Sequence, residues 1–184
     1  MASGLGKRFG SNKLLADFQG KTLIECVLEL TGGELFDKRV VLTRSKAVWK
    51  ICQAQGIEVI LHEMPDRNDA IGLGIRNMQE MDGCIFCPCD QPLLRRESLQ
   101  KMIDAFQLRQ KGMFRLSYGE RQGAPVLFSK EYFSELAELP PKSGGSYLVR
   151  KYPEMVEKIE ASEEYELMDI DTKEDLEQLL NIIS

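Results

Sequence analysis

The sequence predicts an α/β fold with a mostly parallel sheet and helices on both faces. Apolar runs of strand length alternate with longer amphipathic segments of helix length along most of the chain. That alternation is typical of βαβ units, and their right-handed crossovers place helices on both sides of the sheet. Because the sequence contains no repeat, low-complexity tract or linker, we expect a single domain over residues 1–184.

The first half of the chain alternates helices and strands in a regular order. An amphipathic helix ends near Gly32-Gly33, and the apolar run Val40-Val41-Leu42 is typical of a buried strand. We expect helices at residues 21–30, 45–55 and 71–81, and strands at residues 38–43, 57–61 and 84–87.

The second half repeats the alternation less regularly. A helix at residues 97–111 carries its apolar residues on one side. Strands at 114–118 and 124–128 flank a turn, and their pairing stays open. We further expect a helix at 130–139, a short helix that ends near 151, extended segments at 155–159 and 167–170, and a terminal helix from Thr172.

Composition narrows the classes of function. The 184 residues are 43% hydrophobic and 29% charged, with a net charge of −5. The hydrophobic and charged fractions are ordinary for a globular protein. The negative net charge argues against a general nucleic-acid binder, which is normally basic. The apolar runs are too short to span a membrane and no leader is visible, so we expect a cytoplasmic protein. The five cysteines are then expected to be reduced, with Cys84-x-x-Cys87-x-Cys89 as core thiols rather than a metal site.

A glycine-rich, basic stretch occupies the first thirteen residues. Its three glycines allow backbone N–H groups to turn toward an anion, and cations that include Arg8 and Lys13 add positive charge. The spacing of the glycines does not match a Walker A loop. A dinucleotide-binding fingerprint should follow a strand, and none precedes this stretch in the sequence. Taken alone, the stretch fits a phosphate-binding loop and a solvated tail equally well.

Aspartates at the ends of two expected strands are candidate metal ligands. Asp90 follows the strand at 84–87, at the edge where open parallel sheets bind ligands. A carboxylate there suits Mg²⁺ held against a nucleotide, although an aspartate in a turn also serves as a cap. Asp169 and Asp171 lie two residues apart, so strand alternation puts both on one side. Asp171 is also positioned to cap the terminal helix.

Four motifs occur in order along the chain and cover essentially all of it. They are Ala2-Ser3-Gly4-x-Gly6-x-Arg8-Phe9-Gly10-x-Asn12-Lys13-Leu14-Leu15 with Gly20-Lys21, then Cys89-Asp90-Gln91-Pro92-Leu93-Leu94, then Gly123-x-Pro125-Val126-Leu127-Phe128, and finally Asp169-Ile170-Asp171-Thr172-x-Glu174-Asp175-Leu176. In this order they resemble the signatures of the molybdenum cofactor nucleotidyltransferases, and most of all those of the cytidylyltransferases.

The resemblance implies a Rossmann-like, three-layer nucleotidyltransferase domain that joins CTP to the phosphate of molybdopterin and releases pyrophosphate. It implies catalytic roles for Arg8 and Lys13, and Mg²⁺ ligation by Asp90 with Asp171 or Asp169. The nucleotide-binding residues that it implies are Ala2, Ser3, Gly4, Leu5, Gly6, Lys13 and Asp90. The second-substrate residues that it implies are Gly123, Pro125, Gly144, Gly145 and Asp169. A molybdoenzyme or its chaperone is the expected partner, without nucleic acid or membrane.

The chain also departs from the family pattern. The family usually has an apolar first strand before the glycine loop, whereas Met1 falls where that strand should end. We therefore expect either that the true start lies upstream or that another part of the chain fills the place of that strand. The segment Gly72-Leu73-Gly74-Ile75 replaces a serine-bearing pattern, and Lys142-Ser143-Gly144-Gly145 lacks the usual aspartate. Two alternatives therefore stay open: a nucleotidyltransferase for a sugar phosphate or another small phosphate, and a non-catalytic nucleotide- or cofactor-binding protein.

Overall fold

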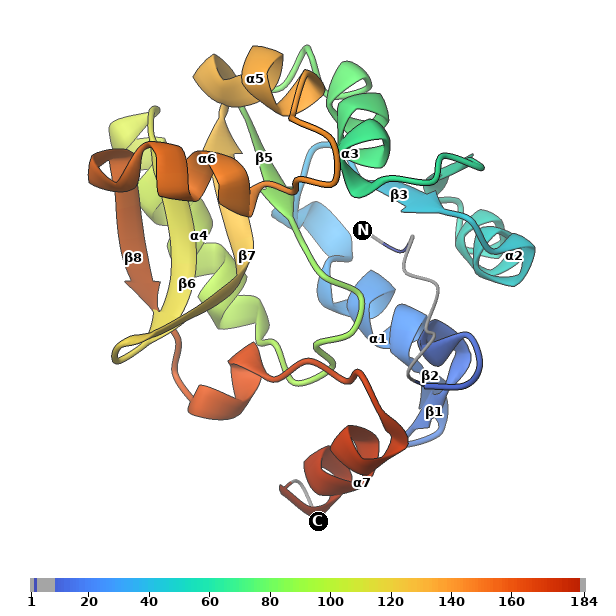
Figure 1. The fold of residues 1–184 in the computed structure, drawn as a ribbon. Helices are drawn as coiled ribbons and strands as arrows, with labels where there is room; N and C mark the ends of the chain where they lie inside the picture. Colours follow the sequence, from blue (N-terminus) through green and yellow to red (C-terminus); the bar gives the residue numbers. More distant parts are fainter. Residues whose placement is uncertain (1, 3–8, 183–184) are drawn as a thin grey trace. The chain divides into compact units, whose positions relative to one another are not determined.

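The computed structural model describes residues 2 and 9–182, and their contacts divide the chain into two compact units. The first unit comprises Met1–Leu61, Pro88–Arg96 and Ser162–Ser184, and the second comprises His62–Cys87 and Glu97–Ala161. Figure 1 labels the helices and strands along the chain. Each unit has its own sheet, so the two are described separately.

Within its described residues, the first unit contains a parallel strand pair, a small antiparallel pair and three α-helices. Its elements are η1 (Lys13–Leu15), β1 (Asp17–Phe18), β2 (Lys21–Thr22), α1 (Leu23–Leu30), η2 (Gly33–Leu35), β3 (Val40–Thr43), α2 (Lys46–Ala54), β4 (Glu58–Leu61), η5 (Glu164–Leu167) and α7 (Lys173–Ile182). The helices predicted at 21–30 and 45–55 and the strands at 38–43 and 57–61 are confirmed, and each end lies at most two residues from its predicted position.

The second unit contains a four-stranded sheet and four α-helices. Its elements are α3 (Arg67–Arg76), β5 (Gly83–Phe86), α4 (Arg96–Arg109), β6 (Met113–Tyr118), β7 (Arg121–Ser129), η3 (Lys130–Tyr132), α5 (Phe133–Ala137), α6 (Ser146–Lys151), η4 (Pro153–Met155) and β8 (Val156–Glu160). The helix predicted at 71–81 begins and ends earlier, as α3, and the one predicted at 130–139 divides into η3 and α5.

Strands β3 and β4 form a parallel pair with α2 as the crossover between them. Ala2, which is 3% exposed, extends the pairing because its N–H donates to the Leu42 carbonyl at 2.9 Å. The Thr43 hydroxyl donates in turn to the Ala2 carbonyl at 3.1 Å. Ala2 therefore forms a parallel bridge with Thr43, next to the point where the sequence leads into the glycine-rich stretch.

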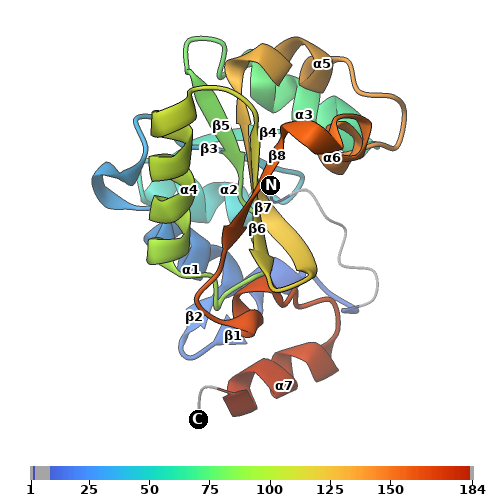
Figure 2. The same cartoon turned by 90° about the vertical axis from the view of Figure 1, so that its left-hand side faces the viewer.

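The sheet of the second unit has the strand order β5-β7-β6-β8. β6 and β8 are parallel, whereas β7 is antiparallel to both β5 and β6. The sheet is thus mixed rather than mostly parallel, because the β6–β7 hairpin inserts a reversed strand between two strands of like direction. Figures 1 and 2 show α4 on one face and α6 on the other, so helices cover both faces as predicted.

Aromatic residues fill both faces of this sheet. On the face covered by α4, the rings of Phe106 and Phe114 meet edge to face with centroids 6.1 Å apart. On the opposite face, the rings of Phe86 and Phe128 lie 5.1 Å apart. The two aromatic pairs lie on opposite faces because side chains alternate along a strand. Neighbouring residues point to opposite faces of the sheet, and residues paired across two strands point to the same face.

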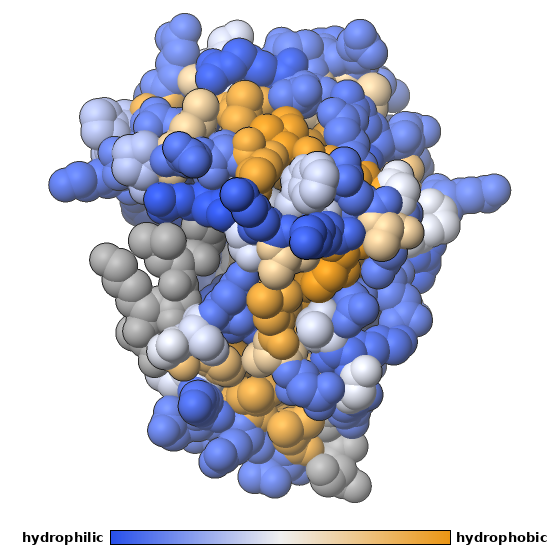
Figure 3. Space-filling model, turned by 90° about the vertical axis from the view of Figure 1, so that its right-hand side faces the viewer, coloured by the Kyte–Doolittle hydropathy of each residue, from blue (hydrophilic) through white to orange (hydrophobic). Residues whose placement is uncertain are grey.

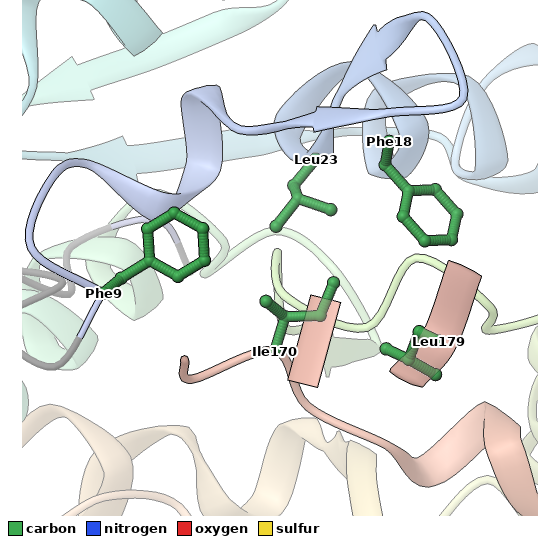
Figure 4. Packing of buried hydrophobic residues seen from close by; sticks show 5 residues of the cluster. All are labelled: Phe9, Phe18, Leu23, Ile170 and Leu179. Carbon is green, nitrogen blue, oxygen red and sulfur yellow. The ribbon is translucent and has the colours of Figure 1, made fainter. Parts of the chain in front are cut away.

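A hydrophobic cluster in the first unit joins the N-terminal segment to the C-terminal segment (Figure 4). Phe9, Phe18 and Leu23 pack with Ile170 and Leu179, and each is at most 6% exposed. Burial of large apolar side chains is the main stabilising contribution in such contacts. The cluster therefore fixes the segment before Lys13 against the segment that carries Asp169 and Asp171.

The prediction of an extended segment at 167–170 is wrong at its beginning. Residues Glu164–Leu167 form the 3-10 helix η5 because the Glu166 carboxylate accepts hydrogen bonds from the backbone N–H groups of Ser162 and Glu163, at 2.9 and 3.1 Å. Glu166 is fully buried, and it also accepts from the Arg95 N–H at 3.1 Å. The strand predicted at 155–159 is confirmed as β8.

Hydrophilic residues predominate on the face drawn in Figure 3, and hydrophobic residues gather there in small patches. Among the residues that the structure describes, the exposed large hydrophobic ones are Leu61, Leu108, Tyr118, Met155 and Ile182. Among the helices formed by the described residues, none combines the length and the apolar character needed to cross a bilayer.

Candidate active site

Lys13 is held in place by a short turn that is anchored on both sides. Gly10 adopts φ +80°, a left-handed conformation that glycine takes without steric cost, and so turns the chain after buried Phe9. The Asn12 side chain then accepts a hydrogen bond from the Leu14 N–H at 3.2 Å and caps η1. Leu14 is itself buried. The backbone of Lys13 is therefore fixed, and only its side chain retains freedom.

Asp90 is fixed by the backbone that surrounds it. Its carbonyl accepts a hydrogen bond from the Ile170 N–H at 2.9 Å. The carbonyl of the next residue, Gln91, accepts from the Leu94 N–H at 3.3 Å and forms the turn after it. Cys89 on the other side is buried. These bonds tie the loop after β5 to the segment that contains Asp169 and Asp171.

The Lys13 ammonium lies between two carboxylates. Its Nζ donates to Asp90 Oδ2 at 2.7 Å and to Asp171 Oδ1 at 2.8 Å. The side chains of Lys13, Asp90 and Asp171 are 11%, 25% and 39% exposed, respectively. We call these three residues the Lys13 cluster. It is buried on the lysine side and open to solvent on the side of Asp171.

Opposing influences act on the pKa of Lys13. Removal from water, the largest influence, lowers the pKa, because burial disfavours the charged form. The hydrogen bonds that Lys13 donates to Asp171 and Asp90, together with the charges of the two carboxylates, outweigh it and raise the pKa of Lys13 above its usual value. The lysine is therefore a permanent cation at neutral pH, and it is held in that state by the two carboxylates.

Asp169 has a different partner. Its Oδ1 accepts a hydrogen bond from Gln91 Nε2 at 2.7 Å. Gln91 is 2% exposed, and its Oε1 has no hydrogen-bond partner among the residues that the structure describes. Desolvation of Asp169, followed by the charge of Asp90, raises the pKa of Asp169, although the hydrogen bond from Gln91 opposes the change. Asp169 thus adds negative charge beside the Lys13 cluster while Gln91 holds its side chain.

The cap of the terminal helix differs from the sequence prediction. Asp171 does not supply it: the Thr172 hydroxyl accepts a hydrogen bond from the Asp175 N–H at 3.1 Å. The Asp175 carboxylate bonds back to the N–H groups of Thr172 and Asp171, at 2.7 and 2.9 Å. This reciprocal arrangement is a capping box. It leaves the Asp171 carboxylate directed to Lys13.

The charges and donor atoms here suit a hard divalent cation. Counted over the described residues alone, the carboxylates of Asp90, Asp171 and Asp169 against the Lys13 ammonium sum to −2 (−3 + 1 = −2). Among the described residues, no three His, Cys, Asp or Glu side chains are placed to enclose a metal ion together. Mg²⁺ needs no such cage, since it is usually held by one or two carboxylates, waters and the phosphates of a substrate. The Asp90–Asp171 pair therefore fits Mg²⁺ bound with a nucleotide.

The expected second-substrate residues, apart from Asp169, belong to the second unit. The Gly123 carbonyl accepts a hydrogen bond from Arg115 Nε at 2.9 Å. A Cβ built on Gly144 would lie 2.9 Å from Arg67 Cδ, and one built on Gly145 would lie 3.0 Å from the Phe128 ring. The two glycines are therefore positions of close packing. Pro125 lies within β7.

Part of the predicted site lies outside the described residues. This applies to Ser3, Gly4, Leu5, Gly6 and Arg8, so their expected contacts with a nucleotide stay predictions. Of the predicted residues that the structure describes, it brings together Lys13, Asp90 and Asp171, with Asp169 beside them.

Sequence reasoning missed two residues that position this site. Gln91 holds Asp169, and Glu166 binds three backbone N–H groups in the segment before it and in the loop of Arg95. Gln91 lies within a quoted motif, which was a signal for it. Glu166 has a local signal, since it forms a capping box with Glu163, but its bond from the Arg95 N–H spans 71 residues of sequence and has none.

An α/β fold in which a lysine is paired with a carboxylate from the loop after a strand suits nucleotidyl transfer. Comparison of the sequence with known families makes the assignment specific. Residues 1–156 match the model of the MobA-like NTP transferase domain, and the chain belongs to this family. The predicted resemblance and the α/β fold class are thereby confirmed.

A curated relative comes from Aquifex aeolicus (strain VF5). It is named a probable molybdenum cofactor guanylyltransferase and is 28% identical over 189 residues, which cover 99% of this chain and 89% of the relative.

Solved structures share the fold. Rv0371c from Mycobacterium tuberculosis H37Rv matches with a TM-score of 0.86 and 24% identity over 98% of this chain and 95% of that one. Its complex with manganese matches with a TM-score of 0.75 and 20% identity, over 97% and 94%. The molybdopterin-guanine dinucleotide biosynthesis protein A from Archaeoglobus fulgidus matches with a TM-score of 0.75 and 20% identity, over 99% and 95%.

Proposed function

We propose that this nucleotidyltransferase transfers a nucleoside monophosphate from a nucleoside triphosphate to the phosphate of molybdopterin, with Mg²⁺, and releases pyrophosphate. The observation that carries the proposal is the position of Lys13 Nζ, within 2.8 Å of both Asp90 and Asp171. The ammonium can bind phosphate oxygens, and the carboxylate pair beside it can bind a metal ion. Nucleotidyl transfer requires both kinds of group to position the phosphates and neutralise their charge.

The proposed reaction requires positioning and charge neutralisation rather than a nucleophilic side chain. An oxygen of the acceptor phosphate attacks the α-phosphorus, one phosphoanhydride bond forms and another breaks, and pyrophosphate leaves with the electron pair. Mg²⁺ would neutralise charge on the phosphates when it is bound. Lys13 and Arg8 would donate to phosphate oxygens, and Asp90 with Asp171 would hold the metal.

Asp171 is a better candidate than Asp169 for the second metal ligand. Asp171 Oδ1 and Asp90 Oδ2 already share one cation, the Lys13 ammonium. The Asp169 carboxylate instead accepts from Gln91, whose amide is buried. We therefore assign Asp169 to the acceptor phosphate in this proposal. The expected roles of Gly123, Pro125, Gly144 and Gly145 in acceptor binding stay predictions.

The nucleotide base needs a direct measurement. The resemblance of the sequence motifs favours CTP, whereas the curated relative from Aquifex aeolicus is named a guanylyltransferase. Neither argument rests on a described contact to a base. The proposal therefore covers both triphosphates. The proposal also includes a cytoplasmic location and transfer of the product to a molybdoenzyme or its chaperone.

The test is an assay of the full-length protein with Mg²⁺, molybdopterin and either CTP or GTP. We expect pyrophosphate release and a dinucleotide product, identified by its mass, with one of the two triphosphates. Asp90→Asn serves as the control and should release pyrophosphate about 10²–10³-fold more slowly, or slower still.

Other outcomes would replace the proposal. Turnover with a sugar phosphate but not with molybdopterin would assign a different acceptor. Tight nucleotide binding without turnover on any phosphorylated acceptor would indicate a non-catalytic binding protein.

A further inference from the structure

Lys13 occupies the same carboxylate oxygens that the proposed metal requires. Its Nζ contacts Asp90 Oδ2 and Asp171 Oδ1 at 2.7 and 2.8 Å, with the lysine side chain 11% exposed. A divalent cation between these two oxygens would lie next to the ammonium and be repelled by it, more strongly than in bulk water because the lysine side chain is largely buried. The ammonium and the metal are therefore competitors for one pair of ligands.

The way in which Lys13 is anchored permits an exchange of partners. Its backbone is fixed by the Asn12 cap and by buried Leu14, so the loop itself does not have to move. The four-carbon stem of a lysine is flexible and ends in a compact point charge. A triphosphate placed beside the cluster offers the ammonium new oxygen acceptors, and the carboxylates are then released for the metal.

We propose that Lys13 is a tethered counter-ion that occupies the Asp90–Asp171 pair until a nucleoside triphosphate arrives, so that the divalent cation enters with the nucleotide rather than before it. This inference rests on the proposed function, because it concerns the metal of nucleotidyl transfer. It adds an order of binding: Mg²⁺ alone binds weakly, and nucleotide and metal strengthen each other's binding. Such coupling is reciprocal by thermodynamic necessity.

The test measures Mn²⁺ binding to the full-length protein without nucleotide, by electron paramagnetic resonance of the free ion. Lys13→Met removes the competing charge and keeps a stem of similar size. We expect it to bind Mn²⁺ about tenfold more tightly than the wild type, since a charge-assisted contact no longer has to be broken. An unchanged or weaker affinity would overturn the inference.

Two matched variants separate the local charge from other effects. Lys13→Arg keeps the positive charge at the cluster and should retain the weak Mn²⁺ binding of the wild type. Lys21→Met removes a positive charge elsewhere in the first unit, where Lys21 pairs with Glu29 on an exposed surface, and should also leave the affinity unchanged. A gain of Mn²⁺ affinity in either control as large as that in Lys13→Met would contradict competition at the cluster.

The wild type provides a second measurement that does not depend on the folding of a variant. The ¹⁵N resonance of the Lys13 ammonium can be followed by nuclear magnetic resonance, because a paired and mostly buried ammonium exchanges its protons slowly. We expect it to shift when an α,β-methylene analogue of GTP or CTP is added with Mg²⁺, and to stay in place with the same concentration of Mg²⁺ alone. A shift with Mg²⁺ alone would refute the order of binding.

The two proposals fail in different assays. Mn²⁺ affinity and the Lys13 resonance require neither molybdopterin nor turnover, whereas pyrophosphate release tests the proposed function. If the wild type releases pyrophosphate but Lys13→Met binds Mn²⁺ no more tightly than the wild type, only the proposed counter-ion role of Lys13 is refuted. If Lys13 competes with Mn²⁺ but the protein does not turn over molybdopterin, the proposed function is refuted and the counter-ion role of Lys13 stands.

Discussion

The Lys13 cluster and the glycines of the second unit were both predicted as binding residues, and they are built in opposite ways. In the cluster, three charged side chains share two hydrogen bonds, and part of each carboxylate remains in contact with solvent. At Gly144 and Gly145, by contrast, an added Cβ would lie 2.9 Å from Arg67 Cδ and 3.0 Å from the Phe128 ring, closer than ordinary van der Waals contact, so little room is left. The first arrangement is suited to an exchange of ligands, whereas the second maintains packing.

The largest effect is expected for Asp90→Asn. This change removes a negative charge that faces Lys13 at 2.7 Å but keeps the size of the side chain. We predict a loss of kcat for pyrophosphate release of about 10²–10³-fold or more, as is typical when one preorganised electrostatic group is removed. The unfolding midpoint should change little. Full activity in the variant would assign the chemistry to another site.

Glu166→Ala tests whether the segment before Asp169 and Asp171 is held by its buried carboxylate. The change leaves the backbone N–H groups of Arg95, Ser162 and Glu163 without an acceptor. We predict a loss of about 3 kcal/mol in the free energy of unfolding, because each unsatisfied buried donor costs about 1–3 kcal/mol. Urea denaturation measures it, with Glu166→Gln as the milder control that keeps one acceptor oxygen. Equal stability of all three proteins would show that these bonds are dispensable.

Gly145→Ala addresses the packing side of the comparison. A Cβ at this position would lie 3.0 Å from Phe128 and 3.2 Å from Phe86, and the Phe128 ring is fully buried. We predict a destabilisation of about 1–3 kcal/mol from overpacking, measured by thermal or urea unfolding. Gly144→Ala is the control: its Cβ would meet the long Arg67 side chain, which can move aside, so the loss should be smaller. The reverse order would contradict a packing role for Gly145.

Lys21→Met should have the smallest effect. The Lys21–Glu29 ion pair has both side chains more than half exposed. Exposed pairs of this kind contribute about 0–1 kcal/mol to stability. We predict a change in the unfolding midpoint close to the error of the measurement and an unchanged rate of pyrophosphate release. A large loss of activity would mean that charge anywhere on the first unit, rather than at the Lys13 cluster, controls the reaction.

The sequence predicted the elements whose signal is local. The helix at residues 21–30 was found because an amphipathic stretch precedes two glycines, and β3 because three apolar β-branched or aliphatic residues follow one another. Long-range pairing had no local signal. The position of β7 between β5 and β6 depends on a hairpin register, and η5 depends on the burial of Glu166. These features therefore emerged only in the structure.

The site divides in the same way. Asp90, Asp169 and Asp171 could be named from sequence because carboxylates at strand ends have a recognisable chemical purpose. Their partners could not, since a contact such as that between Lys13 and Asp171 spans 158 residues. Asp171 was also a candidate helix cap, and the structure gives that role to Thr172 and Asp175. Spacing alone cannot choose between two uses of the same carboxylate.

The central claim is that Lys13 and Asp90 act as one unit in nucleotidyl transfer, and a double-mutant cycle tests it most directly. Pyrophosphate release is measured for the wild type, Lys13→Met, Asp90→Asn and the double variant with the same triphosphate and acceptor. We predict that the double variant is about as slow as the slower single variant, because residues that act as a unit are non-additive. Losses that multiply would contradict the claim and assign the two residues to independent roles.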